Sequence, residues 1–315
     1  MSRKLVVTGA NGFVGSALAR SLQRKGEQVL GLCRRSASLG FPVAEVPSFR
    51  EMPALTQVLS DAEVVIHCAA RVHIMSDSAS DLLESYRQVN TAGTLNLAEQ
   101  AARSGVRRFI YISSIKVNGE ATLAGHPFRP DDSLVPTDPY AISKAEAETG
   151  LLALAERSEM EVVIIRPPLV YGPGVKGNFA SLLKLVETGL PLPLGAIHNK
   201  RSLVALDNLV DLIITCVDHP AAANQTFLAA DGEDLSTSDL LRRLAIAMGR
   251  PSRLIPVPAG LLLLGATALG KKAMARRLLG SLQVDISKTE ETLGWMPPLS
   301  VDEGLRRCFA NYQGE

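Results

Sequence analysis

The sequence predicts an α/β fold, in which a doubly wound parallel sheet is followed by a smaller C-terminal α+β region. Short apolar runs rich in β-branched residues alternate with helical patterns through the first half of the chain. These runs are hydrophobic throughout, which is typical of parallel strands covered by helices on both faces. The regularity ends after Arg166, where Pro and Gly cluster in RPPLVYGPG and GLPLPLG.

The individual elements follow from these patterns in chain order. The apolar runs predict strands over residues 5–9, 27–33, 41–46, 62–70, 106–114 and 160–167. The helical patterns predict helices over residues 12–25, 80–104, 138–156, 207–218, 236–249, 260–270 and 301–312. We therefore expect residues 1–170 to form the main domain, with some later segments returning to it, and residues 171–315 to form mainly the smaller region.

Composition excludes several classes of protein. The chain has 315 residues, of which 46% are hydrophobic and 21% charged, as in ordinary globular proteins. The formal net charge of +1 offers no broad attraction for phosphate backbones, so we expect no nucleic-acid partner. The four cysteines are scattered without a CxxC pair, which predicts reduced thiols in a cytoplasmic protein and no metal site.

The most apolar stretch is GLLLLGATALG, residues 260–270, which is followed by Lys271, Lys272, Arg276 and Arg277. It is too short to cross a bilayer, which needs about 20 apolar residues, so no stable membrane insertion is expected. We favour a helix packed within the smaller region. The alternative is a helix that lies at a membrane interface, flanked by basic residues.

The segment TGANGFVG joins the first strand to the first helix and carries glycines at positions 9, 12 and 15. Such a turn lets backbone N–H groups approach a pyrophosphate at the positive end of the helix. It predicts a dinucleotide coenzyme in a Rossmann-like, NAD(P)-binding main domain. The residues expected to contact the coenzyme here are Gly9, Asn11, Gly12, Phe13, Val14 and Gly15.

The end of the second strand bears on the choice of coenzyme. NAD sites commonly place an acid there for the ribose 2′-OH, whereas an arginine suits the 2′-phosphate of NADP. The sequence has Arg34 and Arg35 at this point and no acid. NADP(H) is therefore favoured, and NAD(H) is the alternative coenzyme. A further alternative is that both arginines bind no phosphate and only begin a solvated loop.

A serine, a tyrosine and a lysine follow the fifth strand. YISSIKVNG ends that strand with two serines, and PYAISK places Tyr140 and Lys144 four residues apart on the next helix. Residues at this spacing lie on one face of a helix. A nearby ammonium favours the phenolate, so we expect Lys144 to lower the pKa of Tyr140, while a serine hydroxyl binds the same substrate oxygen.

These motifs together resemble the extended short-chain dehydrogenase/reductase family, in its NAD-dependent epimerase/dehydratase branch that acts on nucleotide sugars. The resemblance also includes HCAA, VNTAGTLNL, RPPLVYGPG and LGWMPPLSVDEGL, and it covers nearly the whole chain. It selects Ser114 over Ser113 and implies Tyr140 as the acid/base. Lys144 would lower the pKa of Tyr140 and hold the nicotinamide ribose, and Asn90 would support the site from the long helix.

The resemblance implies further contacts. Ala69, Ala70 and Pro167 would lie along the coenzyme, as would Ser48 and Phe49, which replace the usual Asp-Leu after the third strand. The candidates for substrate binding are Arg71, His73, Asn178, Arg201 and Arg276. The alternatives are a helix N-cap for Asn178, a surface charge for Arg201 and an ordinary loop histidine for His73. Lys116 and Asn118 depart from the small residue and tyrosine of many members.

The favoured function is reduction of C4 of a UDP-linked 4-keto-6-deoxy (amino)sugar for surface polysaccharide, with Tyr140 protonating the new alkoxide. The alternative is a UDP-sugar 4-epimerase that keeps NAD bound, since both reactions need Ser114, Tyr140 and Lys144. A dehydratase is less expected, because Ser114-Ile115-Lys116 lacks the extra acids of that branch. A non-catalytic dinucleotide sensor is the remaining alternative. A homodimer is compatible with the sequence.

Overall fold

Seven parallel strands form the main sheet of the structure, a computed structural model that describes residues 3–35, 38–46, 48, 54–72, 79–123 and 125–309. The order across the sheet is β3-β2-β1-β4-β5-β6-β9, and each neighbouring pair is parallel. The strands are β1 (Lys4–Thr8), β2 (Gln28–Cys33), β3 (Val43–Glu45), β4 (Ala62–His67), β5 (Arg108–Ile112), β6 (Glu161–Arg166) and β9 (Gln225–Leu228). This confirms the predicted doubly wound fold.

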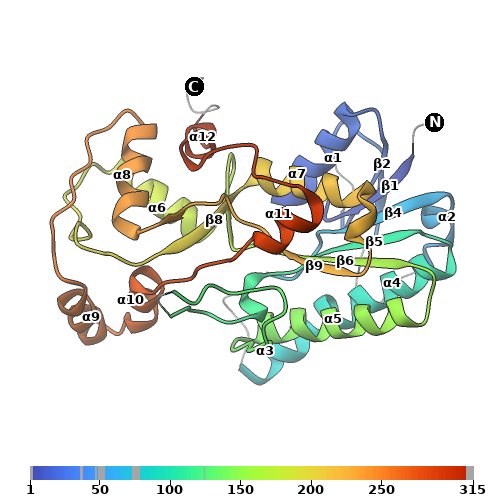
Figure 1. Cartoon of the computed structure of the whole chain (residues 1–315), viewed down its shortest axis with the longest axis horizontal. Coiled ribbons are helices and arrows are strands. Elements are labelled where there is room, and N and C mark those ends of the chain that lie inside the picture. Colours follow the sequence, from blue (N-terminus) through green and yellow to red (C-terminus); the bar gives the residue numbers. More distant parts are fainter. Residues whose placement is uncertain are drawn as a thin grey trace.

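Helices cover both faces of the sheet, and alternate residues of each strand enter different cores. Leu5 and Val7 of β1 pack with α1 (Phe13–Arg24) and α7 (Leu206–Asp218) on one face. Val6 packs on the other face with α4 (Gly93–Arg103) and α5 (Pro139–Glu156). Figure 1 shows these two pairs of helices on opposite sides of the strands. Burial on both faces explains why the strands are continuously hydrophobic.

The long helix predicted over residues 80–104 is present but is not a regular α-helix. It consists of α3 (Ala79–Tyr86), a π-helical segment η1 (Arg87–Ala92) and α4. A π-helical turn inside an α-helix is rare and is often found at functional sites. The segment η1 contains Asn90, one of the residues singled out from the sequence.

The smaller region contains a three-stranded sheet in the order β10-β8-β7. Its strands are β7 (Leu169–Tyr171), β8 (Arg201–Ala205) and β10 (Asp234–Leu235), and its core includes residues of α6 (Asn178–Glu187), α8 (Thr237–Ala247) and α12 (Val301–Arg307). The sequence analysis missed α6, α10 (Lys272–Leu279) and α11 (Ser287–Leu293). The short helices are α2 (Thr56–Leu59), η2 (Ile115–Val117) and η3 (Pro220–Ala222).

The apolar stretch forms the expected helix, α9 (Ala259–Ala268), but not in the expected surroundings. All ten of its residues are described and none is buried, so the prediction that this helix is packed inside the smaller region is wrong. It lies beside α10 at the lower left of Figure 1. Among the described residues, no helix is long and apolar enough to cross a membrane.

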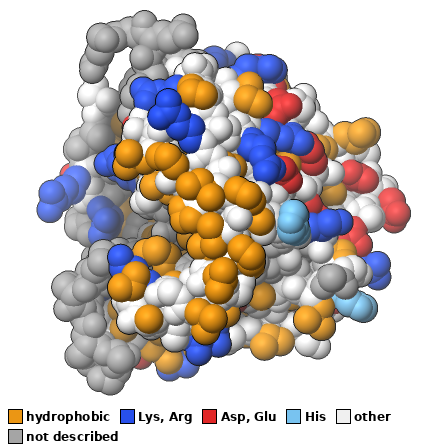
Figure 2. Space-filling model, turned by 90° about the vertical axis from the view of Figure 1, so that its left-hand side faces the viewer, with side chains coloured by type: hydrophobic (Ala, Val, Ile, Leu, Met, Phe, Trp, Pro, Cys, Tyr) orange, Lys and Arg blue, Asp and Glu red, His pale blue; other side chains and the backbone are white. Residues whose placement is uncertain are grey.

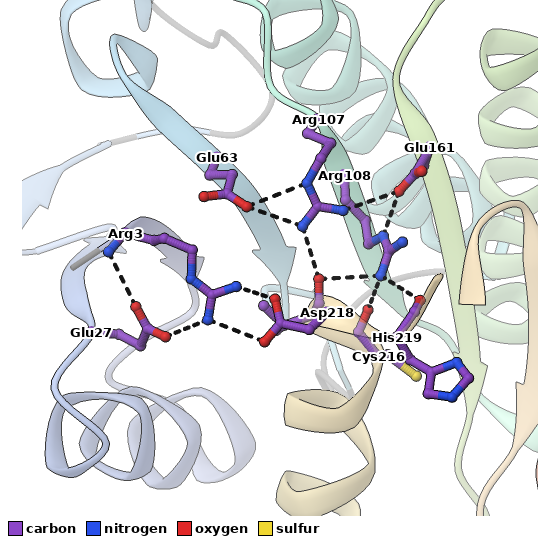
Figure 3. A network of polar contacts seen from close by, with 10 residues as sticks. Arg3, Glu27, Glu63, Arg107, Arg108, Glu161, Cys216, Asp218 and His219 are labelled. Carbon is purple, nitrogen blue, oxygen red and sulfur yellow. Dashed lines mark hydrogen bonds and ion pairs between the residues drawn. The ribbon is translucent and has the colours of Figure 1, made fainter. Parts of the chain in front are cut away.

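A network of charged side chains joins the amino ends of the strands to the end of α7 (Figure 3). Arg108 at the start of β5 is buried and donates hydrogen bonds to the carbonyl oxygens of Cys216, Val217 and His219 at distances of 2.6–3.1 Å. Its Nε also donates to Glu161 at 2.7 Å. A cation here satisfies the last carbonyls of the helix. The opposite edge of the sheet is left for the site.

Candidate active site

The loop after β1 has the geometry of a pyrophosphate cradle. Gly9 has a φ of +65°, which favours glycine, and its carbonyl accepts a 2.7 Å hydrogen bond from the N–H of Gly12. A Cβ on Gly15 would lie only 2.3 Å from the Gly9 oxygen. Gly12 is the N-cap of α1, and no described side chain caps that end. The free N–H groups at the positive end of α1 can therefore receive an anion.

The loops after β1 and β4 meet where the strand order reverses, the position at which doubly wound sheets bind their ligands. A Cβ on Gly9 would lie 2.9 Å from the backbone N and Cα of Ala69. The N–H of Ala69 donates to the hydroxyl of Thr8 at 3.1 Å. The same hydroxyl is hydrogen-bonded to Nδ1 of His67 at 2.7 Å. Ala69, which is predicted to contact the coenzyme together with Ala70, thus lies directly beside the glycine loop.

His67 was part of the HCAA motif, but the sequence did not assign it a role. Its ring is buried, and Nε2 is hydrogen-bonded to the hydroxyl of Thr94 on α4 at 3.0 Å. Burial, with a smaller contribution from the Lys144 cation, lowers the pKa of His67 to about 3. The imidazole is therefore neutral at working pH, and it ties the end of β4 to β1 and α4.

The end of β2 carries no carboxylate. Arg34 and Arg35 are exposed, and the last strand residue, Cys33, is buried with its thiol against the backbone of Ala10 and Asn11. Burial raises the pKa of this thiol. In the strand register Cys33 is paired with Glu45, which is the nearest acid in the adjacent strand. Ser48 lies beyond β3, whereas Phe49 lies outside the described residues.

The predicted catalytic residues gather at the carboxyl end of β5. Ser114 has an extended backbone and its hydroxyl accepts a 3.3 Å hydrogen bond from the N–H of Lys116, which caps η2. Tyr140 lies in the first turn of α5, and Lys144 follows one turn later. The Lys144 ammonium is buried, donates to the carbonyl of Ile112 at 2.8 Å and lies 4.4 Å from the ring centroid of Tyr111. This contact fixes α5 against the end of β5, two residues before Ser114.

No group among the described residues lowers the pKa of Tyr140. Burial raises that pKa, and the Asp138 carboxylate and the Tyr86 hydroxyl raise it further. The rings of Tyr86 and Tyr140 meet edge to face, with centroids 6.0 Å apart. The expected effect of Lys144 is not found, because its ammonium is directed at Ile112 and Tyr111. Tyr140 is therefore a neutral phenol that can donate a proton.

The pKa of Lys144 is shifted in the opposite direction, downwards. Burial lowers its pKa to about 8, against the opposing effects of the Glu148 carboxylate and the Cys68 thiol. Glu148 is in turn held in a buried ion pair with Arg166, at 2.7 Å between Nη2 and Oε2. A lysine with such a pKa is still mostly a cation near neutral pH, although burial makes that charge costly.

Two departures from the family pattern have structural explanations. The amide oxygen of Asn118 is buried and accepts a hydrogen bond from Arg166 at 3.2 Å, and its nitrogen donates to the carbonyl of Arg129 at 3.0 Å. Lys116 forms an ion pair with Asp138, which caps α5 by accepting from the N–H of Ala141 at 2.7 Å. Both residues therefore hold the segments that carry Ser114 and Tyr140.

Asn90 acts on the backbone of the loop after β4. Its Oδ1 accepts from the N–H of Arg71 at 2.8 Å, and its Nδ2 donates to the Arg71 carbonyl at 3.2 Å and to the hydroxyl of Ser143 at 3.1 Å. The side chain is buried, so Asn90 is a positioning residue in this structure. Pro167 is also buried, and its carbonyl accepts from the N–H of Ile115 at 3.0 Å.

The substrate candidates lie in the smaller region, except for Arg71 and for His73, which is outside the described residues. Asn178 is exposed and is the first residue of α6, whose N-cap is Gly177, so the alternative of an N-cap asparagine is wrong. Arg201 at the start of β8 is half-buried, and its guanidinium donates to the carbonyls of Arg277 and Gly280 at 2.9 and 3.1 Å. Burial alone lowers the pKa of Arg201.

Arg201 forms no ion pair with an acid in the described ranges, and it is not a freely exposed surface charge. Its two carbonyl partners belong to the end of α10 and the turn that follows. The same helix carries Arg276 in its last turn, where the side chain is exposed. Arg201 thus contacts the segment that carries Arg276, another candidate for substrate binding.

Residues 5–230 match the family model described as the NAD dependent epimerase/dehydratase family. The chain belongs to this family. One relative, UDP-glucose 4-epimerase of Vibrio cholerae, is 52% identical, with 98% of this chain and 94% of that protein aligned.

Solved structures of similar proteins have the same fold as this member of the epimerase/dehydratase family. UDP-N-acetylglucosamine 4-epimerase from Bacillus cereus superposes with a TM-score of 0.82 at 18% identity, over 99% of this chain and 100% of that one. UDP-glucose 4-epimerase of Thermotoga maritima, solved with UDP-glucose, gives a TM-score of 0.78 at 22% identity, over 98% of each chain. The resemblance recognised in the sequence and the expectation of an enzyme are confirmed.

Proposed function

We propose that this member of the epimerase/dehydratase family transfers hydride at C4 of a UDP-linked sugar, and that its net reaction is reduction of a 4-keto-6-deoxy (amino)sugar used for surface polysaccharide. The observation that carries the proposal is that Tyr140, a neutral phenol, and the buried Lys144 cation lie one helical turn apart on α5 at the carboxyl end of β5. A neutral phenol is the form that donates a proton to a newly formed alkoxide.

The chain's residues fit a dinucleotide coenzyme. Gly9 and Gly15 lie where a Cβ would collide with the backbone, and the start of α1 presents N–H groups without a side-chain cap among the described residues. The coenzyme would supply the hydride that adds to C4. In our proposal the N–H groups of the loop and of α1 hold its pyrophosphate, and Ala69, Ala70 and Pro167 lie along it.

The remaining steps belong to the side chains. The Ser114 hydroxyl donates a hydrogen bond to the C4 oxygen and orients it towards Tyr140. As the C4 carbonyl is reduced, the Tyr140 phenol gives its proton to that oxygen, so the product is the C4 alcohol. The phenolate that is left then recovers a proton from water, and in our proposal the Lys144 ammonium holds the nicotinamide ribose. General acid catalysis of this kind contributes about 100- to 10,000-fold to the rate.

The coenzyme we propose is NADPH, because Arg34 and Arg35 are exposed at the end of β2 and the last residue of that strand is a cysteine. An arginine can bind a phosphate through two parallel hydrogen bonds. For the substrate, we propose that Arg201, Asn178 and Arg276 bind the diphosphate. The UDP group is supported by the Vibrio cholerae and Thermotoga maritima proteins, both named UDP-glucose 4-epimerase.

A 4-epimerase is the second candidate, and it is favoured by the 52% identity to a protein named UDP-glucose 4-epimerase. An epimerase returns the hydride that it removed, so it must retain NAD through the cycle, for which Glu45 beside Cys33 is the nearest acid in the strand register. A reductase must exchange its coenzyme at every turnover.

The experiment measures the coenzyme in the purified protein and follows the absorbance of NADPH with a UDP-linked 4-keto-6-deoxy sugar. The reductase should be isolated largely free of coenzyme and should oxidise NADPH in proportion to product. Stoichiometric NAD in the isolated protein, with interconversion of UDP-hexoses and no added coenzyme, would replace the reductase with the epimerase.

We also propose a cytoplasmic location, a homodimer, and the division near residue 170 into coenzyme and substrate regions.

A further inference from the structure

Helix α9 has an unusual composition for a helix on the surface. Its sequence, AGLLLLGATA, contains no charged residue and is apolar on all sides. A helix that is hydrophobic all round is normally buried in a large core or in a membrane. All ten residues are described, and none of them is buried. The protein therefore exposes a strongly apolar helix to water.

The exposed apolar surface extends beyond the helix itself. Leu261, Leu264 and Leu269 are 61%, 69% and 74% exposed. Ile255 before the helix is 49% exposed, and Met274 on α10 is 58% exposed. We call these five side chains the α9 face. Figure 2 shows a broad band of hydrophobic side chains on the side of the molecule that includes α8 and α9, with Lys and Arg around it and Asp and Glu mainly to its right.

Charge around the α9 face is one-sided. Between residues 240 and 284 the sequence has no Asp or Glu, and it has eight basic residues, namely Arg242, Arg243, Arg250, Arg253, Lys271, Lys272, Arg276 and Arg277. The chain as a whole has a formal net charge of only +1, so this segment is a local concentration of positive charge.

The basic residues next to the α9 face are uncompensated. Arg242 and Arg243 pair with Asp239, Glu233 and Asp302. The four that follow α9, Lys271, Lys272, Arg276 and Arg277, are all exposed, and within the described ranges none of them forms an ion pair. An apolar face thus adjoins four free cations.

We infer that the α9 face docks on the surface of an anionic phospholipid membrane. The exposed leucines would enter the boundary between headgroups and acyl chains, and Lys271, Lys272 and Arg277 would lie among the phosphate headgroups. Ten helical residues span about 15 Å, half of the roughly 30 Å hydrocarbon core, so the helix lies on the membrane and does not cross it.

A second copy of the chain fits this surface less well. A two-fold symmetric contact places the same patch on both subunits. Such a contact would bring two sets of four cations together, and the segment from residue 240 to residue 284 contains no acid to compensate them. A membrane of anionic lipids supplies the missing negative charge.

Docking on this face would bring the membrane close to the proposed substrate region. The last turn of α10 and Gly280 after it provide the carbonyls that hold Arg201, one of the residues proposed to bind the substrate diphosphate. The inference does not depend on which sugar is the substrate, or on whether the reaction is a reduction or an epimerisation, because it rests on the α9 face and the basic residues around it.

The test is flotation of the full chain with vesicles of phosphatidylcholine, with and without phosphatidylglycerol, at low and high salt. Wild type should float only with the anionic vesicles, and less at high salt, because exposed charges are screened. One basic residue near such a surface contributes about fivefold to binding, so Lys271→Glu/Lys272→Glu should weaken it about 30-fold or more. Leu261→Gln/Leu264→Gln should weaken it about tenfold or more.

The matched control is Arg20→Glu/Arg24→Glu, which makes the same change in net charge at exposed positions of α1. It should leave flotation within about twofold of wild type, the range expected for long-range charge alone. Circular dichroism melts check that each variant is folded. The inference is overturned if wild type does not bind anionic vesicles at low salt. It is also overturned if the control loses as much vesicle binding as Lys271→Glu/Lys272→Glu. The inference also fails if Leu261→Gln/Leu264→Gln is monomeric where wild type is dimeric and wild type does not bind the vesicles, because the α9 face would then be a subunit interface.

Discussion

Replacing Lys144 by methionine should abolish turnover yet stabilise the free protein. The side chain is 2% exposed, and burial lowers its pKa from 10.5 to about 8. At about 1.4 kcal/mol per pKa unit, carrying this charge in the folded state costs about 3 kcal/mol at neutral pH. Methionine has a similar length and no charge, and Glu148 keeps its partner Arg166.

The substitution also removes favourable contacts. The hydrogen bond to the Ile112 carbonyl and the contact with the Tyr111 ring together contribute about 1 to 2 kcal/mol. The net expectation is that Lys144→Met raises the free energy of unfolding by about 1 to 2 kcal/mol at pH 7. Residues that cost stability and are retained are common at functional sites.

The pH dependence provides the sharper test. Between pH 8 and pH 10.5 the unfolded chain binds more protons at Lys144 than the folded chain, so wild-type stability gains with rising pH from this residue. The variant lacks this gain. Its advantage should therefore shrink by about 2 kcal/mol between pH 7 and pH 10.

The assay is urea unfolding at both pH values, followed by the fluorescence of Trp295, the single tryptophan. Lys25→Met at an exposed position is the control and should stay within about 0.5 kcal/mol of wild type. A variant that is less stable than wild type at pH 7 would refute the reasoning. So would a difference that is the same at pH 7 and pH 10.

Three further predictions concern the site and its support. Tyr140→Phe should lower turnover by about 100-fold or more while coenzyme binding, measured by fluorescence titration, is nearly unchanged; near wild-type turnover would remove Tyr140 from the mechanism. Arg34→Ala should lower the ratio of NADPH to NADH efficiency, measured as kcat/KM for each, and an unchanged ratio would make Arg34 a bystander and Arg35 the next candidate. Glu148→Gln should lower the free energy of unfolding by about 3 to 5 kcal/mol, because Arg166 is left as a buried, unpaired charge, and a loss below 1 kcal/mol would contradict that account.

Those parts of the fold that depend on local pattern could be predicted from the sequence. The continuous apolar run of β1 and the glycines after it place a strand, a tight turn and a helix start within fifteen residues. The spacing of Tyr140 and Lys144 likewise predicts one helix face, and both residues lie at the start of α5. The parallel arrangement was also predictable, because the helices between the strands provide the crossovers that parallel pairing needs.

The features that were missed depend on contacts between distant segments. The π-helical turn at Asn90 was not predictable, because it accompanies hydrogen bonds to Arg71 and Ser143 that join three separate elements. The direction of the Tyr140 pKa was missed for a similar reason. Helical spacing brings Lys144 close, but the carbonyl of Ile112 decides where the ammonium points. The exposure of α9 was also unexpected, since an apolar sequence predicts burial.

The last strand of the main sheet sets the order in which the molecule can be assembled. The chain leaves the sheet at Arg166, builds most of the three-stranded sheet, and only then returns as β9 to pair with β6. Until Gln225–Leu228 arrive, the outer edge of β6 is a row of unpaired N–H and C=O groups, a template for association between chains. A nascent chain that has already made its glycine loop and its Ser114–Tyr140–Lys144 set therefore still has an open edge. Part of the region that would bind the sugar must therefore be synthesised before the sheet that would hold the coenzyme can close.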